Sequence, residues 1–221
     1  MTALTVALDT ADWRSRVFDL YAAVRERAVR ESPEAAHSLW RAGRDTLFGT
    51  HAASPLSPAA KESFTGLAVA PYDPGFRHEV DIAPSPAGEV IDVQTGTDGV
   101  VRFERLGTVV IPAVGPLALW RLAAYGGGVF LPLRDGLAGI AGGTYGGGRY
   151  VLDTVKGAHL GQGRRPGSLV VDLNFAYNPS CAYNEAWACP LPGAGNRVTV
   201  EVPVGELHPL PPRTRAQFLL E

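Results

Sequence analysis

The sequence predicts a mainly β protein, an antiparallel β-barrel or sandwich with a helical N-terminal segment. Two observations carry this prediction. Apolar residues recur at helical spacing in the first part of the chain, and from Leu67 onward they alternate with polar residues as in strands. Long helical patterns are absent between the candidate strands, which disfavours a parallel α/β sheet. We expect one domain overall, with residues 1–66 as helices packed on an antiparallel β core of residues 67–221.

Three helices are expected in residues 1–66. The first places apolar side chains on one face, from Trp13 to Ala28, and arginines on the other. Each of the next two opens with a serine N-cap and a proline at the first helical position, an arrangement suited to the free N–H groups of a first turn. The start and end signals are Ser32-Pro33 and Gly49 for the second helix, and Ser57-Pro58 and Phe64 for the third.

Short strands are expected after residue 66, separated by Pro, Gly, Asp and Asn. In the last of them, Val200 and Val202 would face the same side because side chains alternate along a strand. The candidate strands are residues 67–72, 77–82, 90–94, 100–106, 108–111, 117–124, 129–133, 149–153, 169–175 and 198–204.

Composition and charge exclude several classes of partner. The chain has 20 basic and 22 acidic residues, a net charge of −2, and no block of like charges. We therefore expect neither nucleic acid nor an anionic membrane as a partner. No apolar run reaches the roughly 18 residues of a membrane span, and the N-terminus lacks the basic region of a secretory signal. These patterns predict a cytoplasmic protein, in which Cys181 and Cys189 would be reduced thiols.

Common catalytic and metal-binding signatures are absent from the sequence. It has no Walker loop, no complete G-x-G-x-x-G, no G-x-S-x-G, no H-E-x-x-H and no C-x-x-C. The histidines are scattered, so we expect no cofactor and no tightly bound metal. Were a metal present, Cys181, Cys189 and His51 would be its first candidate ligands. Because no metal is expected, an enzymatic reaction would be acid–base chemistry.

A glycine triplet, residues 146–148, directly precedes Arg149. Successive glycines let the backbone approach another group closely, and their N–H groups together with the Arg149 guanidinium can cradle an anion. The alternative is a tight turn that opens a strand, with Arg149 paired to a carboxylate inside the protein. Tyr-Gly-Gly-Gly occurs at residues 125–128 and again at 145–148, and we interpret both copies as strand-entry turns.

The segment from residue 171 to residue 190 concentrates polar, aromatic and thiol side chains. Alternation along a strand would place Asp172 and Asn174 on one face, beside a loop with two thiols, tyrosines and Trp187. These groups could form a site, although a thiolate nucleophile needs a basic neighbour and no histidine is near in sequence. The alternative is a connection that holds itself with Asx-turns at Asn178 and Asn184 and buries its aromatic and thiol groups.

Several motifs along the chain carry a family resemblance. The most specific is Tyr-Asn-Pro-x-Cys-x-Tyr at residues 177–183, followed by Cys189-Pro190. The others are Phe-Gly-Thr-His at 48–51, Ser-Pro-Leu at 54–56, Phe-x-Gly-Leu at 64–67, Pro-Tyr-Asp at 71–73 and Thr-Tyr-Gly-Gly-Gly-Arg-Tyr at 144–150. In these motifs the chain resembles the family catalogued as domain of unknown function 1684. The resemblance implies no particular reaction, cofactor or catalytic residue. Similar proteins include exported lipoproteins, which makes a disulfide an alternative to two free thiols.

We expect the β-barrel to bind a small molecule, with Arg149 holding an anionic group and Asp172 accepting hydrogen bonds or a proton. Whether the molecule is a substrate is left open. The alternative is a non-catalytic interaction module whose aromatic loop, residues 177–190, packs on a partner protein. A third interpretation gives every one of these residues a structural role. The candidate ligand-binding residues are Tyr145, Arg149, Tyr150, Asp172, Asn174, Tyr177, Asn178, Cys181, Tyr183 and Cys189.

Overall fold

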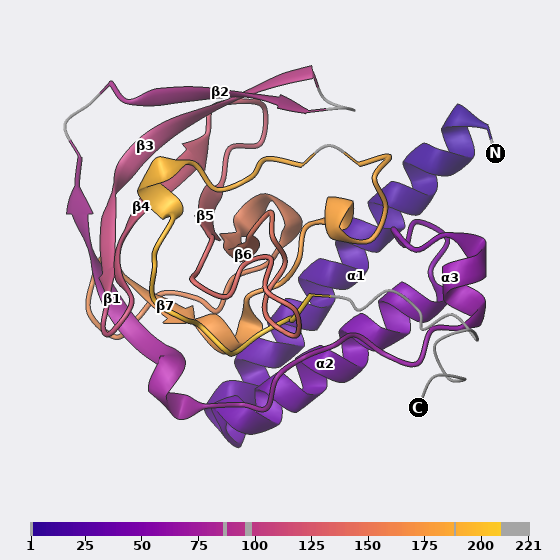
Figure 1. Ribbon diagram of the computed structural model, residues 1–221, viewed down its shortest axis with the longest axis horizontal. Helices are drawn as coiled ribbons and strands as arrows, with labels where there is room; N and C mark the ends of the chain where they lie inside the picture. The colour runs from indigo at the N-terminus through magenta and orange to yellow at the C-terminus, as the bar shows by residue number, and fades with distance from the viewer. Residues whose placement is uncertain (1, 86–87, 96–98, 188, 209–221) are drawn as a thin grey trace.

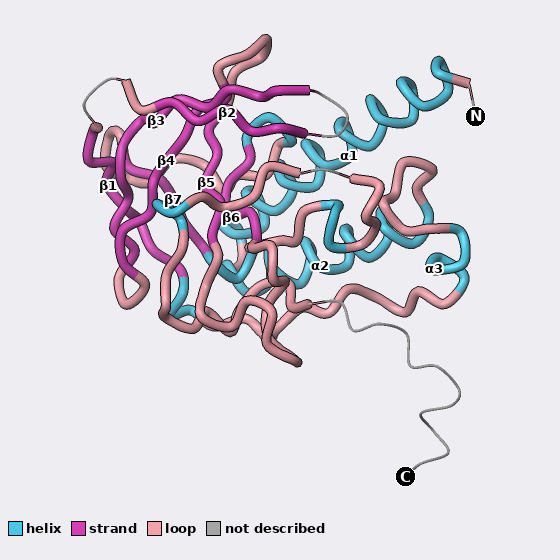
Figure 2. The backbone as a smooth tube through the Cα atoms, turned by 45° about the horizontal axis from the view of Figure 1, so that its top comes forward, coloured by secondary structure: helices cyan, strands magenta, loops and turns pink. Residues whose placement is uncertain are grey.

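A helical hairpin and a curled antiparallel sheet make up the protein. The computed structural model describes residues 2–85, 88–95, 99–187 and 189–208. Figure 1 shows helices α1 and α2 side by side along one flank of the sheet, and Figure 2 shows the strands gathered on the other side. The predicted class is confirmed: seven antiparallel strands form a half-barrel, preceded by helices.

Side-chain caps set the starts of the helices. In α1 (Ala3–Arg30), the hydroxyl of the N-cap Thr2 accepts a hydrogen bond from the N–H of Thr5. In α2 (Pro33–Thr50), the N-cap is Ser32, whose Oγ accepts from the N–H of Ala35 at 3.0 Å. A third helix, α3 (Pro58–Glu62), begins in the same way at Ser57. Both predicted Ser-Pro starts are confirmed.

Gly43 allows α1 and α2 to pack closely together. A Cβ at this position would lie 2.5 Å from a methyl carbon of Leu20 in α1. Glycine weakens a helix interior by ~1 kcal/mol relative to alanine, but here an alanine would displace the Leu20 side chain. Nearby, the indole N–H of the fully buried Trp40 donates to the hydroxyl of Tyr21 at 3.0 Å. The two helices are thus joined by packing and by a buried hydrogen bond.

The sheet curls because its two ends meet. The strands are β1 (Arg77–Pro84), β2 (Val90–Thr95), β3 (Gly99–Ile111), β4 (Gly115–Leu122), β5 (Val129–Leu133), β6 (Arg149–Asp153) and β7 (Ser168–Asp172). Their order is β6-β5-β4-β3-β1-β7, every pair is antiparallel, and β2 pairs with β3. Tyr177, beyond the end of β7, exchanges backbone hydrogen bonds of 2.8 and 2.9 Å with Tyr150 in β6. These two bonds connect the chain after the last strand to the opposite end of the sheet.

Two apolar clusters hold the layers together. One fills the inside of the curled sheet, and the other lies between the helices and the sheet, where Trp40 meets Phe175. Fully burying one such large side chain stabilises the fold by ~1.5–3 kcal/mol relative to leaving it exposed. The inner cluster includes Val109, Ile111, Leu117, Leu119, Leu131, Leu133, Val151, Val171, Leu173, Val202 and Val204.

Two predicted strands, residues 67–72 and 198–204, were wrong. Both segments are extended, but their backbone groups bond to changing partners and make no continuous ladder. For example, the N–H of Val198 bonds to Arg134, whereas residues near 205 bond to Ala70 and Ala176. Val200 is exposed although Val202 is buried, so these two valines do not share a face.

Two further strand predictions need correction. Residues 100–106 and 108–111 form one strand, β3, whose register shifts between Arg105 and Gly107. The strand predicted at 169–175 ends at Asp172, and a 3-10 helix, η3 (Leu173–Phe175), follows. Its cause is local, because the Asp172 carboxylate accepts from the N–H of Asn174 at 3.1 Å and turns the chain.

A buried ion pair joins the helices to the end of the described chain. Glu206 is fully buried, and its Oε1 accepts from Nε of the nearly buried Arg44 in α2 at 2.6 Å. Its Oε2 accepts from the N–H of Asn178 at 2.7 Å and from the hydroxyl of Tyr183 at 2.8 Å. The Arg44 guanidinium also lies over three aromatic rings, those of Trp40, Phe48 and Tyr177.

Replacing Glu206 by glutamine should lower the free energy of unfolding by about 3–5 kcal/mol, because Arg44 would remain buried without its counter-charge. Urea unfolding followed by circular dichroism measures this change. Glu201→Gln, at an exposed position of the same segment, is the control and should change stability by less than about 0.5 kcal/mol. Equal stability of the two variants would contradict the role given to this pair.

Candidate functional site

Arg149 lies inside the protein, where it binds the chain's own carbonyl groups. Its guanidinium donates to the carbonyl oxygens of Val202 at 2.9 Å and of Glu206 at 3.2 Å, and also to that of Val204. The side chain is fully buried, and Asp135 Oδ1 lies 3.5 Å from Nη2. This is the geometry of the alternative interpretation, in which Arg149 pairs with an internal carboxylate, and it leaves no donor facing solvent.

The glycine triplet before Arg149 serves the backbone. The N–H of Gly148 donates to the carbonyl of Tyr145 at 2.8 Å, and a Cβ on Gly148 would lie 2.8 Å from the carbonyl oxygen of Leu133. Gly148 also has a positive φ of 88°. The triplet leads directly into β6, and the copy at 126–128 leads directly into β5. Both copies are therefore strand-entry turns, as predicted.

The carboxylate of Asp172 is fully engaged with its neighbours. Its Oδ2 accepts from the hydroxyl of Tyr72 at 3.2 Å and from Arg77 at 3.1 Å, while its Oδ1 accepts from the Asn174 side chain at 2.7 Å. Asn174 in turn binds the backbone of Asp73 through both of its side-chain atoms. Asp172 and Asn174 thus fix the turn between β7 and the following loop.

Three more of the predicted residues belong to the buried network around Glu206. Asn178 and Tyr183 bind its carboxylate, and the hydroxyl of Tyr177 donates to Asp153 at 3.3 Å. The side chain of Asn178 donates to the carbonyl of Leu207, so the predicted Asx-turn at Asn178 is wrong. The Asx-turn at Asn184 is confirmed, because its Oδ1 accepts from the N–H of Ala186 at 2.9 Å.

The remaining four predicted residues meet at a pair of thiols. Cys181, in the 3-10 helix η4 (Ser180–Ala182), and Cys189 are both half-buried and unbridged, and their side chains hydrogen-bond to each other. The hydroxyl of Tyr145 donates to Sγ of Cys181 at 3.7 Å. The hydroxyl of Tyr150 donates to the carbonyl of Pro190 at 2.7 Å and thereby fixes the chain next to Cys189.

The two thiols differ in acidity. The hydrogen bond from Cys181 lowers the pKa of Cys189 to about 6, although burial acts against it, and the backbone N–H groups of Cys181 and Ser180 lower it further. The same hydrogen bond, together with burial, raises the pKa of Cys181. Cys189 is therefore the more acidic thiol of the pair, and its thiolate is the form that the neighbouring groups favour.

Lys156 supplies the positive charge beside this pair. It ends the 3-10 helix η2 (Thr154–Lys156), its side chain is 45% exposed, and it forms an ion pair of 3.3 Å with Asp153. Its Nζ lies 5.4 Å from the centre of the Tyr150 ring, and its charge also lowers the pKa of Cys189. The basic neighbour that a thiolate requires is thus a lysine rather than a histidine.

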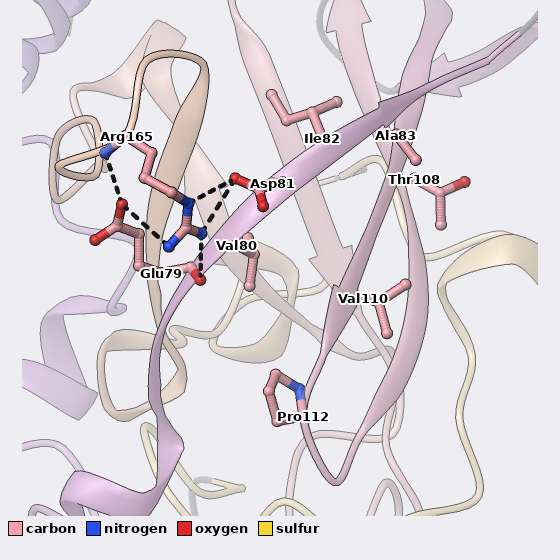
Figure 3. A pocket seen from close by; sticks show the side chains of 9 residues that line it. All are labelled: Glu79, Val80, Asp81, Ile82, Ala83, Thr108, Val110, Pro112 and Arg165. Carbon is pink, nitrogen blue, oxygen red and sulfur yellow. Dashed lines mark hydrogen bonds and ion pairs between the residues drawn. The ribbon is translucent and has the colours of Figure 1, made fainter.

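A groove on the outside of the sheet lies away from the thiols. It has a volume of about 400 Å³ and runs along the outer surface of the sheet, where β1 leaves β3 to pair with β7. Figure 3 shows Arg165 turned toward Glu79 and Asp81 on one side, with Val110 on the other. The Arg165 guanidinium binds Asp81 at 3.1 Å, and the backbone N–H of Arg165 donates to Glu79 at 2.9 Å. The charges of this groove are therefore already paired, and it holds no nucleophile.

Metal ligands do not gather in the part of the chain that the structure describes. No group of three or more His, Cys, Asp or Glu side chains there is arranged to hold an ion. His51, the third candidate ligand, donates from Nε2 to Asp12 Oδ2 at 2.9 Å, and its Nδ1 accepts from the N–H of Ala53. It therefore links α1 to the end of α2.

Sequence reasoning missed the residues that control the candidate site. Asp135, Arg44 and Glu206 reach their partners from positions at least nine residues away in the chain, and Lys156 precedes Cys189 by 33 residues. The only sequence signal for Lys156 is the scarcity of lysine, since Lys61 is the other one in the chain.

Fold and site together define a class of protein: a helix-flanked antiparallel half-barrel with two free thiols on the loop after its last strand. The chain belongs to the family described as "Protein of unknown function (DUF1684)", whose model matches residues 62–207. The resemblance carried by the sequence motifs is thereby confirmed.

Comparison with solved structures gives the same fold. The chain is similar to an uncharacterized protein of Haloarcula marismortui solved by solution NMR, with 29% identity and a TM-score of 0.56. The match covers 81% of this chain and 96% of that one. A comparison with curated proteins found no match. A helix long and apolar enough to cross a membrane is not found among the described residues.

Arg149→Lys should lower the free energy of unfolding by roughly 2–3 kcal/mol, because an ammonium keeps the charge but cannot reach three carbonyl groups as the planar guanidinium does. Arg134→Lys is the matched control, since the Nε of Arg134 makes a single bond to the carbonyl of Gly146. Urea unfolding of both variants tests this. An Arg149→Lys protein as stable as wild type would show that these bonds contribute nothing.

The stability should fall in acid because of His37. Its Nε2 lies 3.0 Å from the carbonyl of Asn174, and burial lowers its pKa below the ordinary value of 6.5. Below pH 6.5 the unfolded state binds a proton that the folded state rejects, so unfolding is favoured as the pH falls. Between pH 7 and pH 5, the melting temperature of His37→Gln should therefore fall less than that of wild type. Parallel pH profiles would contradict this.

Proposed function

We propose that the protein binds a small molecule at the paired thiols and reacts with it through Cys189 without a metal. One observation carries the proposal: Cys189 is half-buried among groups that favour its thiolate, and Cys181 hydrogen-bonds to it. Stabilised, accessible thiolates are typical of reactive cysteines, whereas cysteines with only a packing role lack such surroundings.

Each neighbour has a defined part in this proposal. Cys189 attacks an electrophilic atom of the ligand, and Cys181 holds the proton that the pair shares. Tyr145 orients Cys181 through its hydroxyl, and Tyr150 fixes the backbone at Pro190. Lys156 favours the thiolate and offers a charge to an anionic ligand. The sequence predicted that Arg149 binds an anionic group of the ligand. We assign this role to Lys156 instead, because Arg149 is buried among internal partners.

A reducing compartment agrees with this chemistry. We propose a cytoplasmic location, where thiols of this kind stay reduced and available. The two cysteines are then working groups rather than a structural staple.

A second candidate function, a protein-interaction module, has one observation in its favour. Trp187 is 40% exposed and Leu191 is 44% exposed, both beside the thiols in sequence. The other aromatic groups of the 177–190 loop, Tyr177 and Tyr183, are engaged with Asp153 and Glu206. The apolar surface that this loop offers to a partner protein is therefore small.

The pH dependence of alkylation tests the proposed function. Iodoacetamide should modify Cys189 with an apparent pKa near 6, well below the ~8.5 of an ordinary thiol. In Cys181→Ala the profile should move up by about one unit, because the thiolate loses its main hydrogen-bond donor. Mass spectrometry of the modified peptides measures both rates.

The matched control is Cys189→Ser, in which only Cys181 can react. We expect slow modification of Cys181 at pH 7. If Cys189 in the wild type reacted with the pKa of an unfolded peptide, the proposed function would fail.

A further inference from the structure

The two thiols are placed for bonding to each other as well as to a ligand. They are eight positions apart in one loop, and their side chains already hydrogen-bond to each other. Both ends of this loop are held by the body of the protein. Asn178 and Tyr183, which flank Cys181, bind Glu206, and Tyr150 binds the carbonyl of Pro190 next to Cys189. A disulfide would therefore join two groups that already interact within one anchored loop.

The charge beside the thiols restricts the substrate. Lys156 is half exposed and lies near the ring of Tyr150, whose hydroxyl binds the carbonyl of Pro190 next to Cys189. Its ion pair with Asp153 leaves further ammonium hydrogens for another acceptor, because an ammonium has three donors. A ligand with an electrophilic sulfur at Cys189 can thus place a carboxylate at Lys156.

We propose that Cys181 and Cys189 form a reversible dithiol–disulfide couple for small disulfides that carry a carboxylate, which Lys156 binds. This inference rests on the proposed function, since it uses the same thiolate, and it adds the substrate class and the role of the second thiol.

The reaction balances in two exchange steps. The Cys189 thiolate attacks one sulfur of the small disulfide, a protein–ligand disulfide forms, and the first small thiolate leaves. Cys181 then releases its proton to that thiolate or to solvent, and its sulfur attacks Sγ of Cys189. The Cys181–Cys189 disulfide forms and the second small thiolate leaves. Two protein thiols are oxidised and one small disulfide is reduced to two thiols, and the same steps in reverse, with two small thiols as reductant, restore the pair.

The preference for a carboxylate can be measured with two probe disulfides. 5,5′-Dithiobis(2-nitrobenzoate) carries carboxylates, and 4,4′-dithiodipyridine is uncharged at pH 7.5. At low salt, Lys156→Gln should lower the rate for the anionic probe relative to the uncharged one by about 3- to 10-fold. Because the ratio of the two rates is used, a change in the pKa of Cys189 cancels.

Arg30→Gln is the charge-matched control for Lys156→Gln. Arg30 is exposed at the end of α1, about 18 Å along the helix from Phe18, which packs against Gly157 next to Lys156. Its loss should leave the ratio of rates unchanged. An equal effect of both substitutions, or none from Lys156→Gln, would overturn the assignment of Lys156.

The couple itself is tested by stoichiometry and mass. Wild-type protein should release two equivalents of thionitrobenzoate and end 2 Da lighter, without a retained adduct; reduced glutathione should restore both thiols. Cys181→Ser should release one equivalent and keep one adduct. Retention of one or two adducts by the wild type would overturn the couple. The low pKa of Cys189 would still stand in that case, so failure of the couple and failure of the proposed function are distinguishable.

Discussion

The buried carboxylate of Glu206 connects parts of the chain that are far apart in sequence. Arg44 reaches it from α2, and the Asn178 backbone and the Tyr183 hydroxyl reach it from the loop that carries Cys181. A buried charge is tolerated only when its partners are in place, so each partner constrains the others. The position of the thiol loop therefore depends on the same contact that holds the helices against the sheet.

Local patterns in the sequence were enough for the class of fold and for most elements. The change of hydrophobic period at Leu67 separated helices from strands, and the Ser-Pro pairs marked the starts of α2 and α3. Prediction failed where distant partners decide the backbone. Residues 67–72 and 198–204 have strand-like sequences, but their hydrogen bonds go to several separate segments. Alternation alone does not reveal how many partners a segment has.

The candidate site was only partly predictable, for a related reason. Polar residue types are the same whether they serve a ligand or the fold, and burial decides between these roles. Arg149 and Asp172 proved to be surrounded by internal partners, whereas the tyrosines at 145 and 150 do lie beside the thiols. Lys156 entered the site from another element, and nothing in its local sequence connects it to Cys189.

The Arg44–Glu206 pair also determines which segment of the chain contains all the groups that the buried charge needs. The family model spans residues 62–207, a stretch that contains Glu206 but not Arg44. Cut out at those limits, the sheet would keep a carboxylate in its interior without a countercharge, at a cost comparable with much of a domain's total stability. The half-barrel within residues 62–207 thus depends on a cation that α2 supplies from outside those limits. A gene fusion or an expression fragment that contains the half-barrel must therefore also contain a helix that places a cation beside Glu206.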